Sequence, residues 1–239
     1  FLDRWHTLLV QVLTTSAVEG HPGRTALRDV VTRDWTGEAS PSSAAYQFTR
    51  RFRDVVSERV IRFVLSECYE ADQAFDYLSV RRREGPIWKM LAERPMHLLD
   101  PAFATWDDLM LAAVDDAIAD KANTPPTDLG ARTWGARNVL LYQHPLSAAL
   151  PILGRWLDMP KLTIPGDAYT IRVQSGMLGA SIRMVVSPGQ EAQGLMHMPT
   201  GQSGHPLSAY YANSHPAWAE GQPTPFLPGP PEHTLTLEP

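Results

Sequence analysis

The stretch SPSSAAYQFTRRFRDVVSERVIRFV, residues 40–64, decides the fold of the first half of the chain. Its apolar residues recur at helical spacing and form one broad face, whereas arginines and acidic residues occupy the opposite face. Ser40 is a good N-cap residue, Pro41 suits the first helical position, and the next proline is Pro86. The pattern therefore predicts a long amphipathic helix that begins at Ser40.

Shorter helical patterns lie on both sides of this segment. We expect Gly20, Pro22 and Gly23 to end the first of them. Thr105 and Asp108 form a capping-box-like pair ahead of the last. The acidic pairs that follow within that last segment are expected to form a solvated face and to complement the helix start. The predicted helices are 1–18, 70–79, 86–94 and 106–121.

The pattern of residues changes after the segment NTPPTDLG, residues 123–130. Short runs rich in β-branched and aliphatic residues, bounded by Gly, Pro and Asp, then predict strands. From Gly201 onward we expect an ordered, extended tail whose aromatic residues pack on a larger body. The fold class is α+β, with a mainly helical segment at 1–125 and a β-rich segment with an extended C-terminal tail at 126–239. The predicted strands are RNVLLYQ (137–143), AYTIRVQ (168–174), ASIRMVVS (180–187) and GLMHM (194–198).

Composition excludes several classes of function. The net charge of -5 and the isoelectric point near 5.9 provide no basic face for nucleic acid. No apolar run approaches the ~20 residues that a membrane span needs, so we expect no membrane partner. The single cysteine, Cys68, has no partner for an intrachain disulfide and is expected to be a buried or half-buried thiol.

No sequence motif indicates a complete catalytic or metal site. The segment GQSG, residues 201–204, contains Ser203, but His205 and Pro206 follow where a nucleophile elbow needs Gly and a helix. A tight turn with positive φ at one of the glycines is the favoured interpretation. His197, His205 and His215 would cluster if the tail folded back, yet no acidic or cysteine partner stands at metal spacing, so we expect no metal.

Five segments resemble, in order, the C-terminal part of the β chain of the penicillin acylase (penicillin amidase) family, which includes cephalosporin and acyl-homoserine-lactone acylases. The strongest is PTGQSGHPLSAYYANSHPAWAEGQPTPF, residues 199–226. The others are DWTGEASPSSAAYQF, WGARNVLLYQHPLS, IPGDAYTIRV and GASIRMVVSPG. The sequence YYANS, residues 210–214, departs from the family's pattern and leaves the substrate class open. The residues matched in the strongest segment are Gly201, Gln202, Ser203, Gly204, Ser208, Tyr211, Trp218, Gly221 and Pro225.

The resemblance implies an N-terminal-nucleophile (Ntn) hydrolase that cleaves an amide bond. In that family a precursor cleaves itself, and the new terminal serine attacks the substrate with its own α-amino group as base. Phe1 has no nucleophilic atom, so the resemblance implies no catalytic residue here and an inactive fragment. It implies that this chain forms part of an αββα sandwich. Gly201, Gln202, Ser203, Gly204 and Trp218 would then be a structural motif, and the family's calcium site would lie outside this chain.

The implied partners are the N-terminal part of the same precursor and a small acyl amide. Penicillins, acyl-homoserine lactones and simple amides all stay open as substrates, and the family implies a periplasmic or secreted location. Two alternatives stay open as well. The chain could be a stand-alone small-molecule binding module without catalysis, or an independent hydrolase that uses Ser203 with a nearby histidine.

Overall fold

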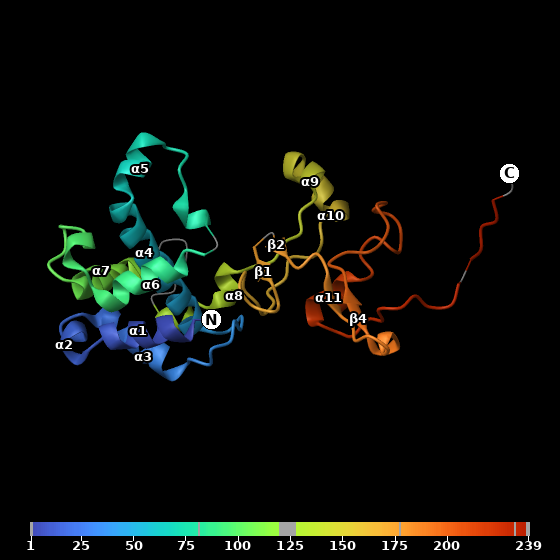
Figure 1. Cartoon of the computed structure of the whole chain (residues 1–239). Coiled ribbons are helices and arrows are strands. Elements are labelled where there is room, and N and C mark those ends of the chain that lie inside the picture. Colours follow the sequence, from blue (N-terminus) through green and yellow to red (C-terminus); the bar gives the residue numbers. More distant parts are fainter. Residues whose placement is uncertain (1, 81, 120–127, 177, 232, 238–239) are drawn as a thin grey trace. The chain divides into compact units, whose positions relative to one another are not determined.

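The computed structural model describes residues 2–80, 82–119, 128–176, 178–231 and 233–237. The chain divides into two compact units, Phe1–Arg137 (unit 1) and Asn138–Pro239 (unit 2), coloured blue to green and yellow to red in Figure 1. Long helices occur in unit 1 and short antiparallel strands in unit 2, which confirms the α+β class. The predicted division after residue 125 falls among residues outside the described ranges and stays a prediction, as does the four-layer sandwich.

Unit 1 is organised around one central helix. The long helix α4 packs against α1, α3 and α7 (Figure 1). Their facing side chains form a core that includes Trp5, Leu9, Leu27, Val31, Phe48, Phe52, Val56, Leu109, Met110 and Val114. The described elements are α1 (Asp3–Val12), α2 (Thr15–Val18), α3 (Pro22–Arg33), α4 (Ala44–Val64), α5 (Ser66–Ala71), η1 (Tyr77–Ser79), α6 (Glu84–Glu93), η2 (Met96–Leu98), α7 (Trp106–Ala119), η3 (Leu129–Ala131) and α8 (Trp134–Arg137).

The central helix is confirmed, but the prediction of its first residue was wrong. The N-cap is Ser43, whose Oγ accepts a hydrogen bond from the backbone N–H of Tyr46 at 3.0 Å. Residues 40–43 form a turn instead, because the carbonyls of Pro41 and Ser43 accept the N–H groups of Gly135 and Trp134. The start of α4 is thus displaced by a long-range contact that the local sequence does not reveal.

Two serines near this helix start provide a matched pair of variants. Ser43→Ala removes the acceptor of the Tyr46 N–H, and we expect it to lower the free energy of unfolding by about 1 kcal/mol. Ser40→Ala removes only a contact with the Ser42 hydroxyl, and we expect no comparable change. Urea unfolding followed by far-UV circular dichroism measures both. Equal losses in the two variants would contradict the assignment of Ser43 as the cap.

Local polar contacts explain where the other helix predictions failed. Within the predicted helix at 70–79, only the end of α5 at residues 70–71 and the single turn η1 are helical, because Asp72 and Asp76 accept hydrogen bonds from the backbone N–H groups of Ala74 and Ser79. Such contacts compete with helical hydrogen bonds. The predicted helix at 1–18 is two helices, α1 and α2, which end before Gly20 as expected, but Pro22 then begins a further helix, α3, that the sequence analysis did not predict. Cys68 is exposed, contrary to expectation.

The capping box of α7 is confirmed, and the helix also carries ion pairs to its neighbours. Asp108 Oδ2 accepts the Thr105 N–H at 2.9 Å, and the Asp108 N–H donates to Thr105 Oγ1 at 3.1 Å. Asp115, expected only to face solvent, accepts two hydrogen bonds from Arg24 of α3, at 2.8 and 2.6 Å. The Arg24 guanidinium lowers the pKa of Asp115 below its ordinary value, mainly through this hydrogen bonding.

The lowered pKa of Asp115 predicts a pH dependence. A carboxylate whose native pKa is depressed stabilises the fold above its unfolded pKa of about 3.9, and that contribution is lost as the pH falls through the native pKa. Asp115→Asn should therefore flatten the decline in stability below about pH 4. The change should stay under about 1 kcal/mol because Asp115 is half exposed. Unfolding midpoints at pH 3 to 7 test this, and curves that stay parallel would contradict it.

Unit 2 contains short elements joined by long loops. Strand β1 (Gln174–Ser175) pairs with β2 (Leu178–Gly179), and β3 (Arg183–Val185) pairs with β4 (Leu195–His197), both antiparallel. The predicted strand at 137–143 is reduced to a single bridge between Leu140 and Leu162, and the one at 168–174 reaches a strand only at Gln174. The described helices are α9 (Pro145–Ala149), η4 (Pro151–Leu153), α10 (Gly154–Leu157), η5 (Glu191–Gln193) and α11 (His215–Glu220).

A pair of buried amides holds the first part of unit 2. The Asn138 side-chain amide donates to Gln174 Oε1 at 2.7 Å and to the Gly166 carbonyl at 3.1 Å, and its oxygen accepts the Gly176 N–H at 3.1 Å. A Cβ at Gly166 would lie 2.4 Å from the Arg172 carbonyl, and the residue has a φ of +131°. The segment IPGD is therefore a close backbone approach that only glycine permits.

Candidate functional site

The candidate site is the segment from Gly201 to Gly204, which pairs with the tail that follows it. The Gly201 N–H donates to the Tyr211 carbonyl at 2.7 Å, and the Ser203 N–H donates to the Tyr210 carbonyl at 3.1 Å. The prediction of positive φ at one of the glycines is wrong, since neither is among the residues with positive φ. Gly201 is needed for a different reason, because a Cβ there would lie 1.8 Å from the Tyr210 carbonyl oxygen.

Ser203 and its neighbouring histidine have no catalytic geometry. Ser203 Oγ accepts the backbone N–H of His205 at 3.1 Å, which is a local turn contact. His205 Nδ1 in turn accepts the Leu207 N–H at 3.1 Å. A catalytic serine needs a hydrogen bond from its hydroxyl to a base side chain. The contacts of Ser203 and His205 instead shape the loop, so the geometry favours the structural interpretation of Ser203.

Gln202 lies beside a small polar hollow. Its Nε2 donates to the Met198 sulfur at 2.7 Å, and the hollow has a volume of about 190 Å³. Pockets for drug-sized ligands usually measure at least about 300 Å³, so this one has room only for a small molecule or an ion. Its lining residues are Met196, His197, Met198, Gln202, Ser214, Thr224 and Pro225.

Trp218 packs the tail against the earlier part of unit 2. Its side chain is 1% exposed and packs with Leu140, Ile164 and Ala219, while the Tyr142 ring meets it edge-on at 5.5 Å. The indole N–H donates to the Ala180 carbonyl at 2.9 Å. A Cβ at Gly179 would lie 2.9 Å from the indole ring. The expectation that aromatic residues of the tail find a packing surface thus holds for Trp218, whereas Tyr210 is exposed.

Two histidines, His197 of β4 and His215 of the tail, bind backbone carbonyls. His197 Nε2 interacts with the Gln222 carbonyl, and His215 Nδ1 with the Pro199 carbonyl at 2.6 Å. Both side chains are buried, whereas His205 is exposed. Within the residues that the structure describes, no group of three His, Cys, Asp or Glu side chains is placed to hold a metal ion. The two buried histidines therefore fasten the tail to the segment around β4.

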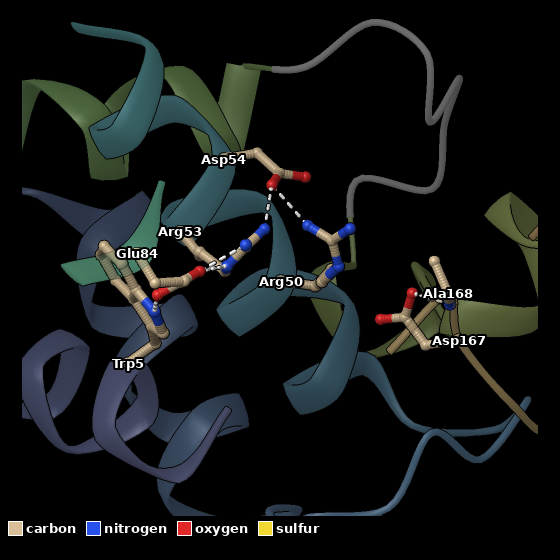
Figure 2. A network of polar contacts seen from close by, with 7 residues as sticks. All are labelled: Trp5, Arg50, Arg53, Asp54, Glu84, Asp167 and Ala168. Carbon is tan, nitrogen blue, oxygen red and sulfur yellow. Dashed lines mark hydrogen bonds and ion pairs between the residues drawn. The ribbon is translucent and has the colours of Figure 1, made fainter. Parts of the chain in front are cut away.

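Sequence reasoning missed an ionic network around one buried arginine of unit 1. Arg53 is 2% exposed, although it belongs to the charged face of the predicted helix, and its guanidinium pairs with Asp54 and with Glu84 of α6 (Figure 2). Glu84 also accepts the indole N–H of Trp5 at 2.9 Å, and Arg50 pairs with Asp54. The only signal in the sequence was the large number of charged residues on this face of the helix, between residues 50 and 59. This network joins α1, α4 and α6 and takes part in no pocket described above.

The site contains backbone pairing, a buried tryptophan and histidines that bind carbonyls. Among the contacts described above, those of Ser203, Trp218 and the two buried histidines all lie within unit 2. The penicillin amidase family model matches residues 4–232, and the chain belongs to this family of hydrolases.

A curated relative agrees with this membership. The chain is 28% identical over 122 residues to the penicillin acylase 2 proenzyme of Pseudomonas sp. (strain SE83). The matched stretch covers 47% of this chain but only 16% of that protein. The chain thus matches a small part of a much longer relative.

Among the described residues, no helix combines the length and the apolar character that crossing a membrane requires.

Proposed function

We propose that this chain is the C-terminal portion of a penicillin-acylase-like amidohydrolase, and that it supports the catalytic part of the enzyme without supplying the nucleophile. The observation that carries the proposal is the family match over residues 4–232. The local bonding of Ser203 and His205 supports a structural role, because both side chains already bind the loop's own backbone. The reaction is hydrolysis of the linear amide of an acylated small molecule, such as a penicillin or an acyl-homoserine lactone, by the Ntn mechanism.

The proposed partner is the N-terminal part of the same precursor, with a periplasmic or secreted location. The surface of unit 2 supports this partner, because many of its apolar side chains face solvent. Ile171 is 99% exposed. Apolar surface and short unprotected strands usually meet another protein surface. The other exposed apolar side chains of unit 2 include Leu146, Leu150, Ile152, Trp156, Leu178, Ile182, Met184 and Val185.

The experiment begins with the protein purified from its source cell. Intact mass and N-terminal sequencing should identify a second polypeptide that starts with Ser, Thr or Cys and travels with this chain. The preparation should hydrolyse at least one substrate from a panel of penicillin G, acyl-homoserine lactones and simple aryl amides. Ser203→Ala should leave the rate unchanged within about twofold, because Ser203 Oγ serves only a turn.

Two outcomes would contradict the proposal. Turnover by the isolated chain that disappears in Ser203→Ala would make it an independent serine hydrolase. A ligand-dependent rise in melting temperature of the isolated chain, with no partner polypeptide and no turnover, would favour the stand-alone binding module. The hollow beside Gln202 is the place where such a ligand would first be sought.

A further inference from the structure

Two arginines of unit 2 share one end of helix α11. Arg172 Nη1 donates to the Ala219 carbonyl at 3.4 Å, and Arg183 donates through Nη2 to the adjacent Trp218 carbonyl. The Arg183 guanidinium also lies over the Trp218 ring, 4.7 Å from its centroid. Because the two acceptors are neighbouring carbonyls of one short helix, the two guanidiniums lie close together.

This pair of cations has no compensating negative charge among the described residues. Neither Arg172 nor Arg183 forms an ion pair there, although Glu220 belongs to the same helix. Carbonyl groups supply dipoles but no net charge, so the pair keeps a charge close to +2. By comparison, Arg24, Arg53 and Arg59 of unit 1 each pair with a carboxylate.

The surroundings of Arg183 make this arrangement costly. Both arginines are half-buried, and the Arg183 Nε is a buried donor with no hydrogen-bond partner within the described chain. Burial lowers the pKa of Arg183, and the neighbouring charge of Arg172 lowers it further. A buried charge is stabilised by an opposite charge and by hydrogen bonds to its remaining donors. A carboxylate supplies both, since its two oxygens match the planar fork of a guanidinium.

We propose that Arg172 and Arg183 form a carboxylate-binding site at the C-terminal end of α11. The carboxylate lies between the two guanidiniums and accepts hydrogen bonds from donors that do not serve the Trp218 and Ala219 carbonyls. The carboxylate belongs either to a small-molecule anion or to an acidic side chain from another part of the protein. The proposal rests on the contacts of Arg172 and Arg183 and does not depend on the proposed function.

Titration of the chain with sodium acetate at constant ionic strength tests the site. The arginine Nε–H signals of Arg172 and Arg183, assigned with the variants Arg172→Lys and Arg183→Lys, are followed by NMR. We expect both signals to shift together and to saturate with one dissociation constant in the millimolar range. Acetamide, which has the same shape without the charge, should produce no saturable shift.

Variants separate this site from general attraction between charges. Arg172→Gln and Arg183→Gln should each weaken acetate binding at least tenfold. Arg155→Gln is the matched control, because Arg155 is an exposed arginine of the same unit that stacks on Trp156. It should leave the binding unchanged. An equal response to sodium chloride, a linear response without saturation, or no response of either signal would overturn the site, and titration of the unmodified chain decides this even if a variant fails to fold.

A second experiment distinguishes the two possible sources of the carboxylate. Phenylglyoxal modifies accessible arginines, and peptide mass mapping reports each position. If both arginines react in the isolated chain but are protected without added acetate in protein purified whole from its source cell, the carboxylate belongs to another part of the protein. Protection that requires acetate would identify a site for a free small molecule. Either result supports the carboxylate site, whereas modification of both arginines that acetate does not slow would contradict it.

Discussion

Gly201→Ala is expected to open the loop that holds the tail on unit 2. A Cβ at this position would lie 1.8 Å from the Tyr210 carbonyl oxygen and 2.6 Å from Asn213 Oδ1. The first of these atoms is backbone and cannot rotate away, so the paired segments must separate. Overpacking of this kind typically costs about 1–3 kcal/mol, and we expect the upper end of that range. The two hydrogen bonds from the Gly201 and Ser203 N–H groups should break.

Hydrogen exchange of individual amides measures this effect. The amides of residues 201 and 203 should exchange roughly a hundredfold faster in the variant, since each ~1.4 kcal/mol corresponds to a factor of ten. Gly204→Ala is the matched control, because nothing lies within 4 Å of a Cβ there and its φ is not positive. It should leave both amides protected. Unchanged exchange in Gly201→Ala would mean that the 201–211 pairing does not constrain the loop.

The contrast between these glycines shows how far the sequence could be interpreted. The segment GQSG predicted a tight turn with positive φ at a glycine, but its backbone pairs with Tyr210 and Tyr211, and the hydrogen-bonded turn lies just after it, from His205 to Ser208. Positive φ is a local property that sequence patterns often reveal, whereas the approach of the Tyr210 carbonyl to Gly201 depends on how the tail returns. Sequence reasoning could name the residues of the loop but could not identify the contact that requires glycine.

The same distinction holds for the helices and strands. The apolar face of α4 was predictable because its apolar residues recur with a period of 3.6 residues in the local sequence. Its first residue was not predictable, since the carbonyls of Pro41 and Ser43 accept hydrogen bonds from backbone N–H groups of α8, more than 90 residues later. In unit 2 the predicted strands are mostly loops. There, buried amides such as Asn138 and Gln174 hold the backbone by side-chain hydrogen bonds in place of long ladders.

Glu84→Ala is expected to destabilise unit 1 more than any exposed charge change. It removes one carboxylate from Arg53, which is 2% exposed, and it removes the acceptor of the Trp5 indole N–H (Figure 2). Breaking a buried ion pair from one side typically costs about 3–5 kcal/mol, because the other charge stays buried. We expect about 2–3 kcal/mol here, since Arg53 keeps Asp54 at 2.9 Å. Urea unfolding followed by far-UV circular dichroism measures the change.

The two ends of this ion pair should respond unequally. Arg53→Met replaces a buried cation with an apolar side chain of similar length, and it leaves Glu84, which is 37% exposed, free to bind water. Its cost should therefore be smaller than that of Glu84→Ala, and the double variant should be no less stable than Glu84→Ala alone. Glu58→Gln, which breaks an exposed pair with Arg62 on the same helix, should leave the unfolding midpoint unchanged. If Arg53→Met proved the more damaging of the two, the arginine would stabilise unit 1 through its packing against neighbouring side chains, and the charge of Glu84 would be incidental.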